Sequence, residues 1–323
     1  MTLFALDATR SLGLRVAAAL GLTLAAHEAR DFEDGEHKLR PIHLVADRDV
    51  YVLQSLYADA EHSVNDKLVR LLFFLGALRD AGAARVTAVL PYLAYARKDA
   101  RTQPNDPLSS RYVAQMIEAL GVGCTVAVEV HNPAAFQNAF RSRAEHVPAT
   151  AVFADAIAAG LTPGEPITVV SPDPGGFKRA DQLRAALTKR LGREVELAFM
   201  EKRRALGKLS VGRLVGDVAG TTAVIVDDIV ASGSTLAAAA AECQSQGARQ
   251  VIAAAAHGLF VPPANRVLAD AAIARMLVSD SVPPYRLAAG SVRDRVEIVS
   301  IAPLIAQAVD RLHRGASLAD LSA

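Results

Sequence analysis

The chain has 323 residues, of which 51% are hydrophobic and 21% charged, a balance typical of one large globular domain or two similar domains. Its 35 basic and 34 acidic residues nearly cancel, which argues against a surface for nucleic acid or for an anionic membrane. The 2 cysteines lie far apart and exclude a disulfide framework. The longest apolar stretches, such as residues 16–26, are too short or too interrupted to span a bilayer, and the N-terminus lacks a signal-peptide pattern, so we expect a cytoplasmic protein.

Short β-rich runs alternate with longer helical runs along the chain. The clearest helix is expected at residues 64–83, where apolar side chains recur at spacings of three or four. Strands joined by single helices imply right-handed crossovers and a parallel sheet, so the sequence predicts an α/β fold. The expected strands are 50–54, 85–90, 124–130, 167–171, 195–200, 223–226, 250–255 and 296–301, and the other expected helices are 110–120, 177–191, 235–246 and 303–312.

Residues 142–152 break this alternation, and we expect a domain boundary there. The predicted domains are residues 1–148 and 149–323, which share an order of elements but no evident sequence repeat. Ligands of parallel α/β sheets bind beyond the carboxyl ends of the strands. Unusual residues at predicted strand ends are therefore the candidates for a functional site.

The most informative strand end follows residues 223–226. Asp227 and Asp228 come first, and a loop of small residues then leads into a helix: Ala231, Ser232, Gly233, Ser234 and Thr235. Adjacent carboxylates can accept hydrogen bonds from sugar hydroxyls, and a Ser/Gly/Thr turn that opens a helix offers backbone amides to a phosphate. The pattern predicts a pocket for a phosphorylated sugar, and a surface turn beside a chance acidic pair is the alternative.

This stretch resembles the loop that binds phosphoribosyl pyrophosphate (PRPP) in type I phosphoribosyltransferases and in PRPP synthases. Five further segments resemble the PRPP synthase (ribose-phosphate diphosphokinase) family in order and approximate spacing, namely DFEDGEHKLR, PYLAYARKDAR, VEVHNPAAFQNAF, ITVVSPDPGGFKRA and FMEKRR. Phosphoribosyltransferases usually lack several of these segments, so membership of that family is the second interpretation of the sequence. The resemblance covers nearly the whole chain and implies two phosphoribosyltransferase-like domains, each with a mainly parallel sheet flanked by helices.

The resemblance implies an enzyme that transfers the diphosphoryl group of ATP to O1 of ribose 5-phosphate, with AMP as the second product. It implies Mg²⁺ as the cofactor, with His131 and Asp173 as metal ligands. It also implies a homo-oligomer, a dimer or a hexamer, whose active site is shared between subunits. An altered-specificity diphosphokinase and a non-catalytic regulatory paralogue remain alternatives.

The resemblance also assigns roles to residues of the other segments. The implied ATP-binding residues are Phe32, Asp34, Gly35, Glu36, Arg97, Lys98 and Asp99. The implied ribose 5-phosphate residues are Asp173, Arg204, Asp227, Asp228 and the loop 231–235, the two adjacent carboxylates holding ribose hydroxyls directly or through a metal. Lys202 and Arg204 would stabilise the transition state from a loop that closes over the substrate.

Two segments depart from the family pattern. Where the family usually has YARQDR or YARQDK, this chain has Lys98 in place of the neutral amide and Ala100 in place of the last cation. Because this segment is implied to bind ATP, the two changes leave open which nucleotide is the diphosphoryl donor and how tightly it binds. Ser234 replaces a glycine of the family's usual T-G-G-T turn, which could narrow the phosphate turn.

Overall fold

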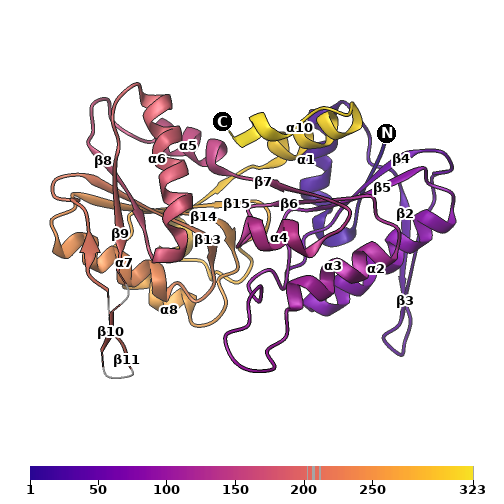
Figure 1. The fold of residues 1–323 in the computed structure, drawn as a ribbon, viewed down its shortest axis with the longest axis horizontal. Helices are drawn as coiled ribbons and strands as arrows, with labels where there is room; N and C mark the ends of the chain where they lie inside the picture. Colours follow the sequence, from indigo (N-terminus) through magenta and orange to yellow (C-terminus); the bar gives the residue numbers. More distant parts are fainter. Residues whose placement is uncertain (202, 206–207, 211, 323) are drawn as a thin grey trace. The chain divides into compact units, whose positions relative to one another are not determined.

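The computed structural model describes residues 1–201, 203–205, 208–210 and 212–322, and it divides into two units (Figure 1). Unit 1 comprises Met1–Pro148 together with Ala302–Ser322, and unit 2 comprises Ala149–Ile301. Each unit has a mainly parallel sheet with helices on both faces, which confirms the predicted α/β class. None of the helices in the described part of the chain is long and apolar enough to cross a membrane.

Unit 1 is built on a five-stranded parallel sheet in the order β1-β4-β5-β6-β7. Its strands are β1 (Thr2–Ala5), β4 (Asp49–Leu53), β5 (Arg85–Leu90), β6 (Cys124–Val128) and β7 (Arg143–Val147). The central strands are apolar along nearly their whole length and almost entirely buried. Such continuous burial is expected of parallel strands that are covered on both faces.

The helices of unit 1 cover the two faces of this sheet (Figure 1). One face carries α1 (Arg10–Leu20) and α10 (Ala302–His313), and the other carries α2 (Val64–Asp80), α3 (Ser109–Ala119) and α4 (Pro133–Ala139). α2 begins at a capping box, in which the Ser63 side chain accepts from the Asp66 amide and the Asp66 carboxylate accepts from the Ser63 amide. A polar hairpin of β2 (His27–Asp31) and β3 (His37–Pro41) packs against α2.

The helix α10 lies in unit 1, whereas the second domain predicted from the sequence, residues 149–323, includes this helix. α10 buries one apolar face, which includes Leu304, Ile305 and Val309, and packs against α1. An amphipathic pattern shows that a helix buries one face, but it does not show which sheet receives that face.

Unit 2 is built on a seven-stranded sheet in the order β12-β9-β8-β13-β14-β15-β16, in which only β12 runs antiparallel to its neighbour among the strands described. Helices α5 and α6 lie on one face, and α7 and α8 lie on the other (Figure 1). The strands are β8 (Ile167–Ser171), β9 (Glu196–Met200), β12 (Leu214–Val215), β13 (Thr222–Val230), β14 (Gln250–Gly258), β15 (Arg275–Ser279) and β16 (Val296–Val299). The helices are α5 (Thr150–Ala159), α6 (Phe177–Leu191), α7 (Ser234–Ser245), α8 (Ala264–Ala269) and α9 (Ser291–Asp294), and β10 (Arg203–Ala205) pairs with β11 (Lys208–Ser210) outside the sheet.

All the strands and helices expected from the sequence are present, but several further elements were missed. The missed strands include β7, which lies inside the stretch 142–152 that was expected to contain only a boundary. β7 has the sequence RAEHV and is mostly half-buried, so it lacks the apolar run by which central strands are recognised. β13 extends beyond the predicted 223–226 and includes both Asp227 and Asp228.

Gly13 allows α1 to lie directly against β1, because a Cβ atom at this position would overlap the Ala5 side chain. We expect Gly13→Ala to reduce the free energy of unfolding by about 1–3 kcal/mol through overpacking. Gly76→Ala is the matched control, since a Cβ in the middle of α2 would lie 3.4 Å from Leu120, an ordinary contact. Urea unfolding of both variants tests the prediction, and equal stability of the two would contradict it.

Candidate functional site

The predicted phosphosugar residues of unit 2 gather at the carboxyl ends of β13 and β8, which are adjacent parallel strands. Asp228 is only 4% exposed, and Asp227 beside it is half-buried. The Asp227 Oδ1 atom accepts a hydrogen bond of 2.8 Å from the Asp228 amide. Two adjacent carboxylates thus lie close together where little water reaches them.

Arg179 on α6 lies beside this carboxylate pair. One guanidinium nitrogen is 3.7 Å from Asp227 Oδ1 and 3.5 Å from Asp228 Oδ1. Burial, together with the neighbouring Asp228 carboxylate, raises the pKa of Asp227 to about 8, and the Arg179 charge opposes this increase. Full ionisation of both carboxylates is therefore unfavourable in the free protein. Sequence patterns did not single out Arg179 as a site residue.

The loop after β13 ends in a tight turn at Gly233, which is the N-cap of α7 and has φ 79°. A Cβ atom at this position would lie 2.7 Å from the buried Leu268 side chain. Gly233 offers no side-chain acceptor to the first amides of α7, and Ser234 and Thr235 are exposed. The Ser234 amide makes only a long hydrogen bond of 3.5 Å to Ser232 Oγ, and a helix start with so little capping is suited to an anionic group such as a phosphate. The Ser232 and Ser234 hydroxyls lie 3.0 Å apart and hydrogen-bond to each other.

Asp173 follows β8 and is held by the turn that leads into α6. Its Oδ1 atom accepts a 2.9 Å hydrogen bond from the Gly176 amide, and its carbonyl accepts a 2.6 Å hydrogen bond from the Ser171 hydroxyl. A Cβ at position 176 would lie 2.9 Å from Ser171 Oγ, so glycine lets the Ser171 hydroxyl approach this turn closely. The turn fixes the backbone of Asp173 and the first residues of α6, the helix that carries Arg179.

The residues predicted to bind a metal supply few protein ligands. No group of three or more His, Cys, Asp or Glu side chains in the described part of the chain could enclose an ion. Mg²⁺ usually keeps several waters and binds one or two carboxylates together with substrate phosphates. The half-buried Asp173 carboxylate fits this donor set, and His131 is an exposed imidazole that follows β6 in unit 1.

The segment after β5 carries the residues predicted to bind the ATP phosphates. Arg97 is exposed, and within the described residues its side chain has no hydrogen bond or ion pair. Lys98 instead forms an ion pair of 2.5 Å with Asp106. Asp99 accepts a 2.8 Å hydrogen bond from the Asn132 side chain, which ties this segment to the residue next to His131.

Four of the predicted ATP-binding residues, Phe32, Asp34, Gly35 and Glu36, lie at and beside the turn of the β2–β3 hairpin. Gly35 has φ 91°, and the Asp34 carboxylate accepts a 3.0 Å hydrogen bond from the Glu36 amide. The Phe32 ring is 39% exposed, with the Arg30 guanidinium 5.0 Å from its centre. No hydrogen bond or ion pair among the described residues joins this turn to the Arg97 segment.

The predicted transition-state residues follow β9. Lys202 lies outside the described residues. Arg204 belongs to β10 and is paired with Leu209 of β11, but its side chain lies outside the described part. Their roles stay predictions.

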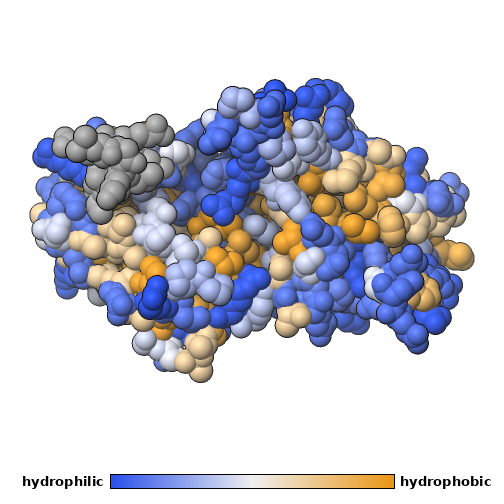
Figure 2. All heavy atoms as spheres, turned by 90° about the horizontal axis from the view of Figure 1, so that it is seen from below, coloured by the Kyte–Doolittle hydropathy of each residue, from blue (hydrophilic) through white to orange (hydrophobic). Residues whose placement is uncertain are grey.

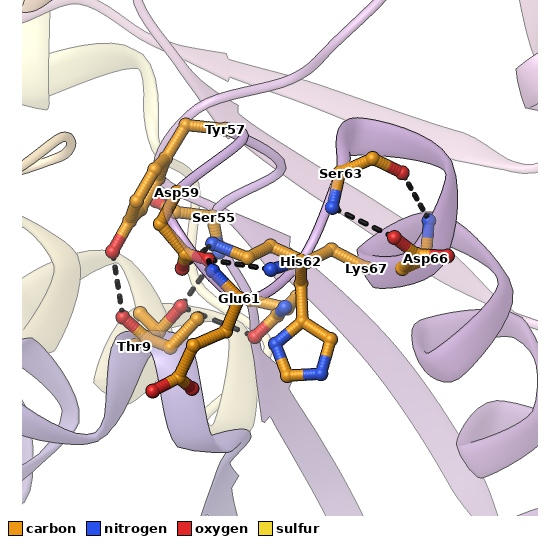
Figure 3. A network of polar contacts seen from close by, with 11 residues as sticks. Thr9, Ser55, Tyr57, Asp59, Glu61, His62, Ser63, Asp66 and Lys67 are labelled. Carbon is orange, nitrogen blue, oxygen red and sulfur yellow. Dashed lines mark hydrogen bonds and ion pairs between the residues drawn. The ribbon is translucent and has the colours of Figure 1, made fainter. Parts of the chain in front are cut away.

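A buried polar network that sequence patterns did not reveal supports the end of β4 in unit 1 (Figure 3). Lys67 is only 1% exposed, forms an ion pair with Asp59 and lies 3.7 Å from the centre of the Tyr57 ring. The Tyr57 hydroxyl donates a 3.0 Å hydrogen bond to the Ala8 carbonyl. A lysine this deep is tolerated because its charge is paired. The network holds the loop after β4 to the chain beyond β1.

Comparisons with known proteins agree with the resemblance in the sequence. Residues 1–121 match the model of the N-terminal domain of ribose phosphate pyrophosphokinase, and residues 196–322 match that of the phosphoribosyl synthetase-associated domain. The chain is 36% identical over 312 residues to a ribose-phosphate pyrophosphokinase of Aquifex aeolicus, an alignment that covers 97% of this chain and 96% of the relative. It is 32% identical over 326 residues to ribose-phosphate pyrophosphokinase 1 of Streptococcus pyogenes, with 99% and 97% covered. The crystal structure of phosphoribosylpyrophosphate synthetase from Mycobacterium smegmatis covers 97% of this chain and is itself 99% covered, with 32% identity and a TM-score of 0.85.

Proposed function

The chain belongs to the ribose-phosphate pyrophosphokinase family, and from that premise we propose that it transfers the diphosphoryl group of ATP to O1 of ribose 5-phosphate, giving PRPP and AMP. The observation that carries this proposal is the end of β13, where the adjacent Asp227 and Asp228 carboxylates are followed by the loop that opens α7. Together they offer acceptors for sugar hydroxyls and amides for a phosphate.

On this proposal the 5-phosphate binds the loop 231–235, whose backbone amides and hydroxyls neutralise its charge. Asp227 and Asp228 accept hydrogen bonds from the ribose hydroxyls. Because burial and mutual repulsion make full ionisation of this pair costly, hydrogen bonds donated by the sugar hydroxyls would stabilise the ionised carboxylates when the sugar binds. Arg179 orients both carboxylates from α6.

ATP is proposed to bind the segment after β5. The exposed guanidinium of Arg97 is suited to polyphosphate oxygens, which it can engage with two parallel hydrogen bonds. Lys98 and Asp99 belong to the same segment, and Asp99 keeps it in place through Asn132. Phe32 presents an exposed ring that can stack on adenine, with Asp34, Gly35 and Glu36 around it, and the family resemblance assigns this hairpin to the site of a neighbouring subunit.

A homo-oligomer of two or six copies is part of the proposal. Figure 2 shows a hydrophobic area on unit 1, and separate support comes from large apolar side chains that α2 and α3 leave exposed. Val69 and Phe73 lie one turn apart on α2, and Tyr112 and Met116 lie one turn apart on α3. Exposed apolar surface of this kind is typical of protein interfaces.

Mg²⁺ is proposed to be held by Asp173 near the ribose and by His131 near the triphosphate, with waters and phosphate oxygens as the other ligands. When bound, the ion neutralises negative charge on the phosphoryl oxygens. The two buried cysteines are unpaired, as a reducing compartment allows, and we place the protein in the cytoplasm.

We expect Lys202→Ala to lower kcat by about 100-fold or more with less than a threefold change in the Kd for ribose 5-phosphate, because a cation that acts in the transition state contributes little to ground-state binding. Steady-state kinetics and calorimetric titration separate the two quantities. An equal loss in both would contradict the proposed role.

The function itself is tested with purified protein, Mg²⁺, ATP and ribose 5-phosphate, followed by mass spectrometry. Equal amounts of AMP and PRPP are expected. A folded protein that binds ribose 5-phosphate but forms neither product would contradict the proposal and favour a regulatory paralogue.

A further inference from the structure

The loop between β5 and α3 is organised around one carboxylate oxygen. Asp106 Oδ2 accepts hydrogen bonds from the Lys98 ammonium at 2.5 Å, from the Thr102 hydroxyl at 2.8 Å, and from the amides of Thr102 and Gln103 at 2.9 and 3.0 Å. Four donors on a single oxygen leave little freedom to this carboxylate. The Asp106 carboxylate thus holds the two sides of the loop together through hydrogen bonds within the loop.

Asp106 keeps its negative charge throughout the physiological pH range. The Lys98 ammonium and the hydrogen bonds from Thr102 hold the pKa of the Asp106 carboxyl well below its usual range. Lys98 and Asp106 are both only partly exposed, with 33% and 23% of their side chains accessible. The pair therefore carries no net charge toward solvent.

The two neighbouring cations of this segment, Arg97 and Lys98, differ in whether their charge is paired with a carboxylate. Arg97 is exposed and, within the described residues, is not hydrogen-bonded or ion-paired. Lys98 is engaged by Asp106 and also lies 3.4 Å from the Thr102 hydroxyl. Its carbonyl accepts a hydrogen bond from the Ser110 amide near the start of α3, so its backbone is fixed as well.

We propose that Asp106 is a positioning residue that holds the Lys98 ammonium inside this loop, so that Arg97 and not Lys98 presents its charge to the nucleotide polyphosphate. This inference rests on the proposed function and refines it. Lys98 then acts on ATP binding only by fixing the conformation of the loop, and the Asp106 carboxylate balances its positive charge. A lysine at this position thereby adds no net charge to a pocket that must bind a polyanion and release AMP.

Asp106→Asn is the first test, because an amide oxygen can still accept from the Thr102 and Gln103 amides while the negative charge is lost. The uncompensated Lys98 charge should tighten ATP binding about 3- to 10-fold at 50 mM salt, and the gain should shrink at 500 mM salt. Titration calorimetry with Mg²⁺ and ATP on the full chain measures both values. Looser or unchanged ATP binding in this variant would overturn the proposal.

The double variant K98Q/D106N decides between a sequestered and a phosphate-bound lysine. Lys98→Gln alone should weaken ATP binding, since it leaves Asp106 uncompensated near a polyanion. Adding Asp106→Asn should return the Kd to within about twofold of the starting protein, as expected for two charges that cancel. If Lys98 contacts the polyphosphate directly, the double variant stays as weak as Lys98→Gln, and the proposal is wrong.

Asp310→Asn is the matched control, because it removes one carboxylate from the Asp310–Arg314 ion pair at the C-terminal end of α10. It should leave the Kd for ATP as it was, which separates a local effect from a change in net charge. Thermal unfolding of every variant checks that the loop change leaves the fold intact. An unaltered protein that binds ATP but makes no PRPP would refute the proposed function, while the ATP titrations would still decide the role of Asp106.

Discussion

Replacing Gly233 with alanine should lower kcat/KM for ribose 5-phosphate by about 100-fold, mainly through KM. Two features of the turn oppose a side chain. The backbone has φ 79°, which L-residues adopt only with strain, and the new methyl group would lie 2.7 Å from Leu268. Because Leu268 is buried, the turn must move instead, and with it the amides proposed to hold the phosphate. Kinetics with varied ribose 5-phosphate at saturating ATP measure the effect.

Gly247→Ala provides the control for this prediction. Gly247 follows α7 with φ 86°, but the nearest atoms to an added Cβ, those of Ala219, are 3.8 Å away. The variant should lose about 1 kcal/mol of stability and keep its KM for ribose 5-phosphate. If both variants had the same KM as the starting protein, the loop 231–235 would not be the phosphate site.

Asp227→Asn should make the free protein more stable while lowering kcat/KM by about 100-fold. The amide is neutral, so it removes the repulsion between two buried carboxylates and keeps a similar shape. The same change removes an acceptor proposed to bind the ribose hydroxyls. We expect a gain of about 1–3 kcal/mol in the free energy of unfolding at pH 8.

The pH dependence of this gain follows from the direction of the shift. A carboxyl whose pKa rises from 3.8 to about 8 on folding binds its proton more tightly in the folded state. As the pH increases between these values, the unfolded chain loses that proton while the folded chain keeps it, and folding becomes less favourable. The stabilisation by Asp227→Asn should therefore grow from pH 4 to pH 8 and stay constant above. Urea unfolding across this range measures it, and a gain that is the same at every pH would show that Asp227 is already ionised in the free protein.

Two of the central strands could be predicted from the sequence with accurate bounds. Residues 85–90 and 167–171 were predicted as strands and are β5 and β8, because strands covered on two faces are largely apolar along their length. The hairpin of β2 and β3 was missed for the opposite reason. Its strands are largely polar and mostly exposed, and what holds it is a contact with α2 that includes His37 stacked on Phe73 at 5.3 Å.

The site could be predicted in its segments but not in its pairings. Asp173 and Asp227 were both singled out because each ends an apolar strand. The proximity of Arg179 to the carboxylate pair depends on β8 and β13 being neighbours, which local patterns do not reveal. Lys98 was expected to bind ATP, and its ion pair with Asp106 depends on a loop fold in which Asn105 has φ 63°.

The packing of α10 against α1 has a consequence for biosynthesis. Unit 2 is one uninterrupted stretch of chain, whereas unit 1 is assembled from two stretches with all of unit 2 between them. Chains are made from the N-terminus and domains tend to fold as they emerge, so the apolar face of α1 stays uncovered until residues 302–313 leave the ribosome. During that interval unit 2 can finish folding while unit 1 cannot. In the nascent first unit this apolar face of α1 is then available for unwanted contacts for as long as unit 2 is being made.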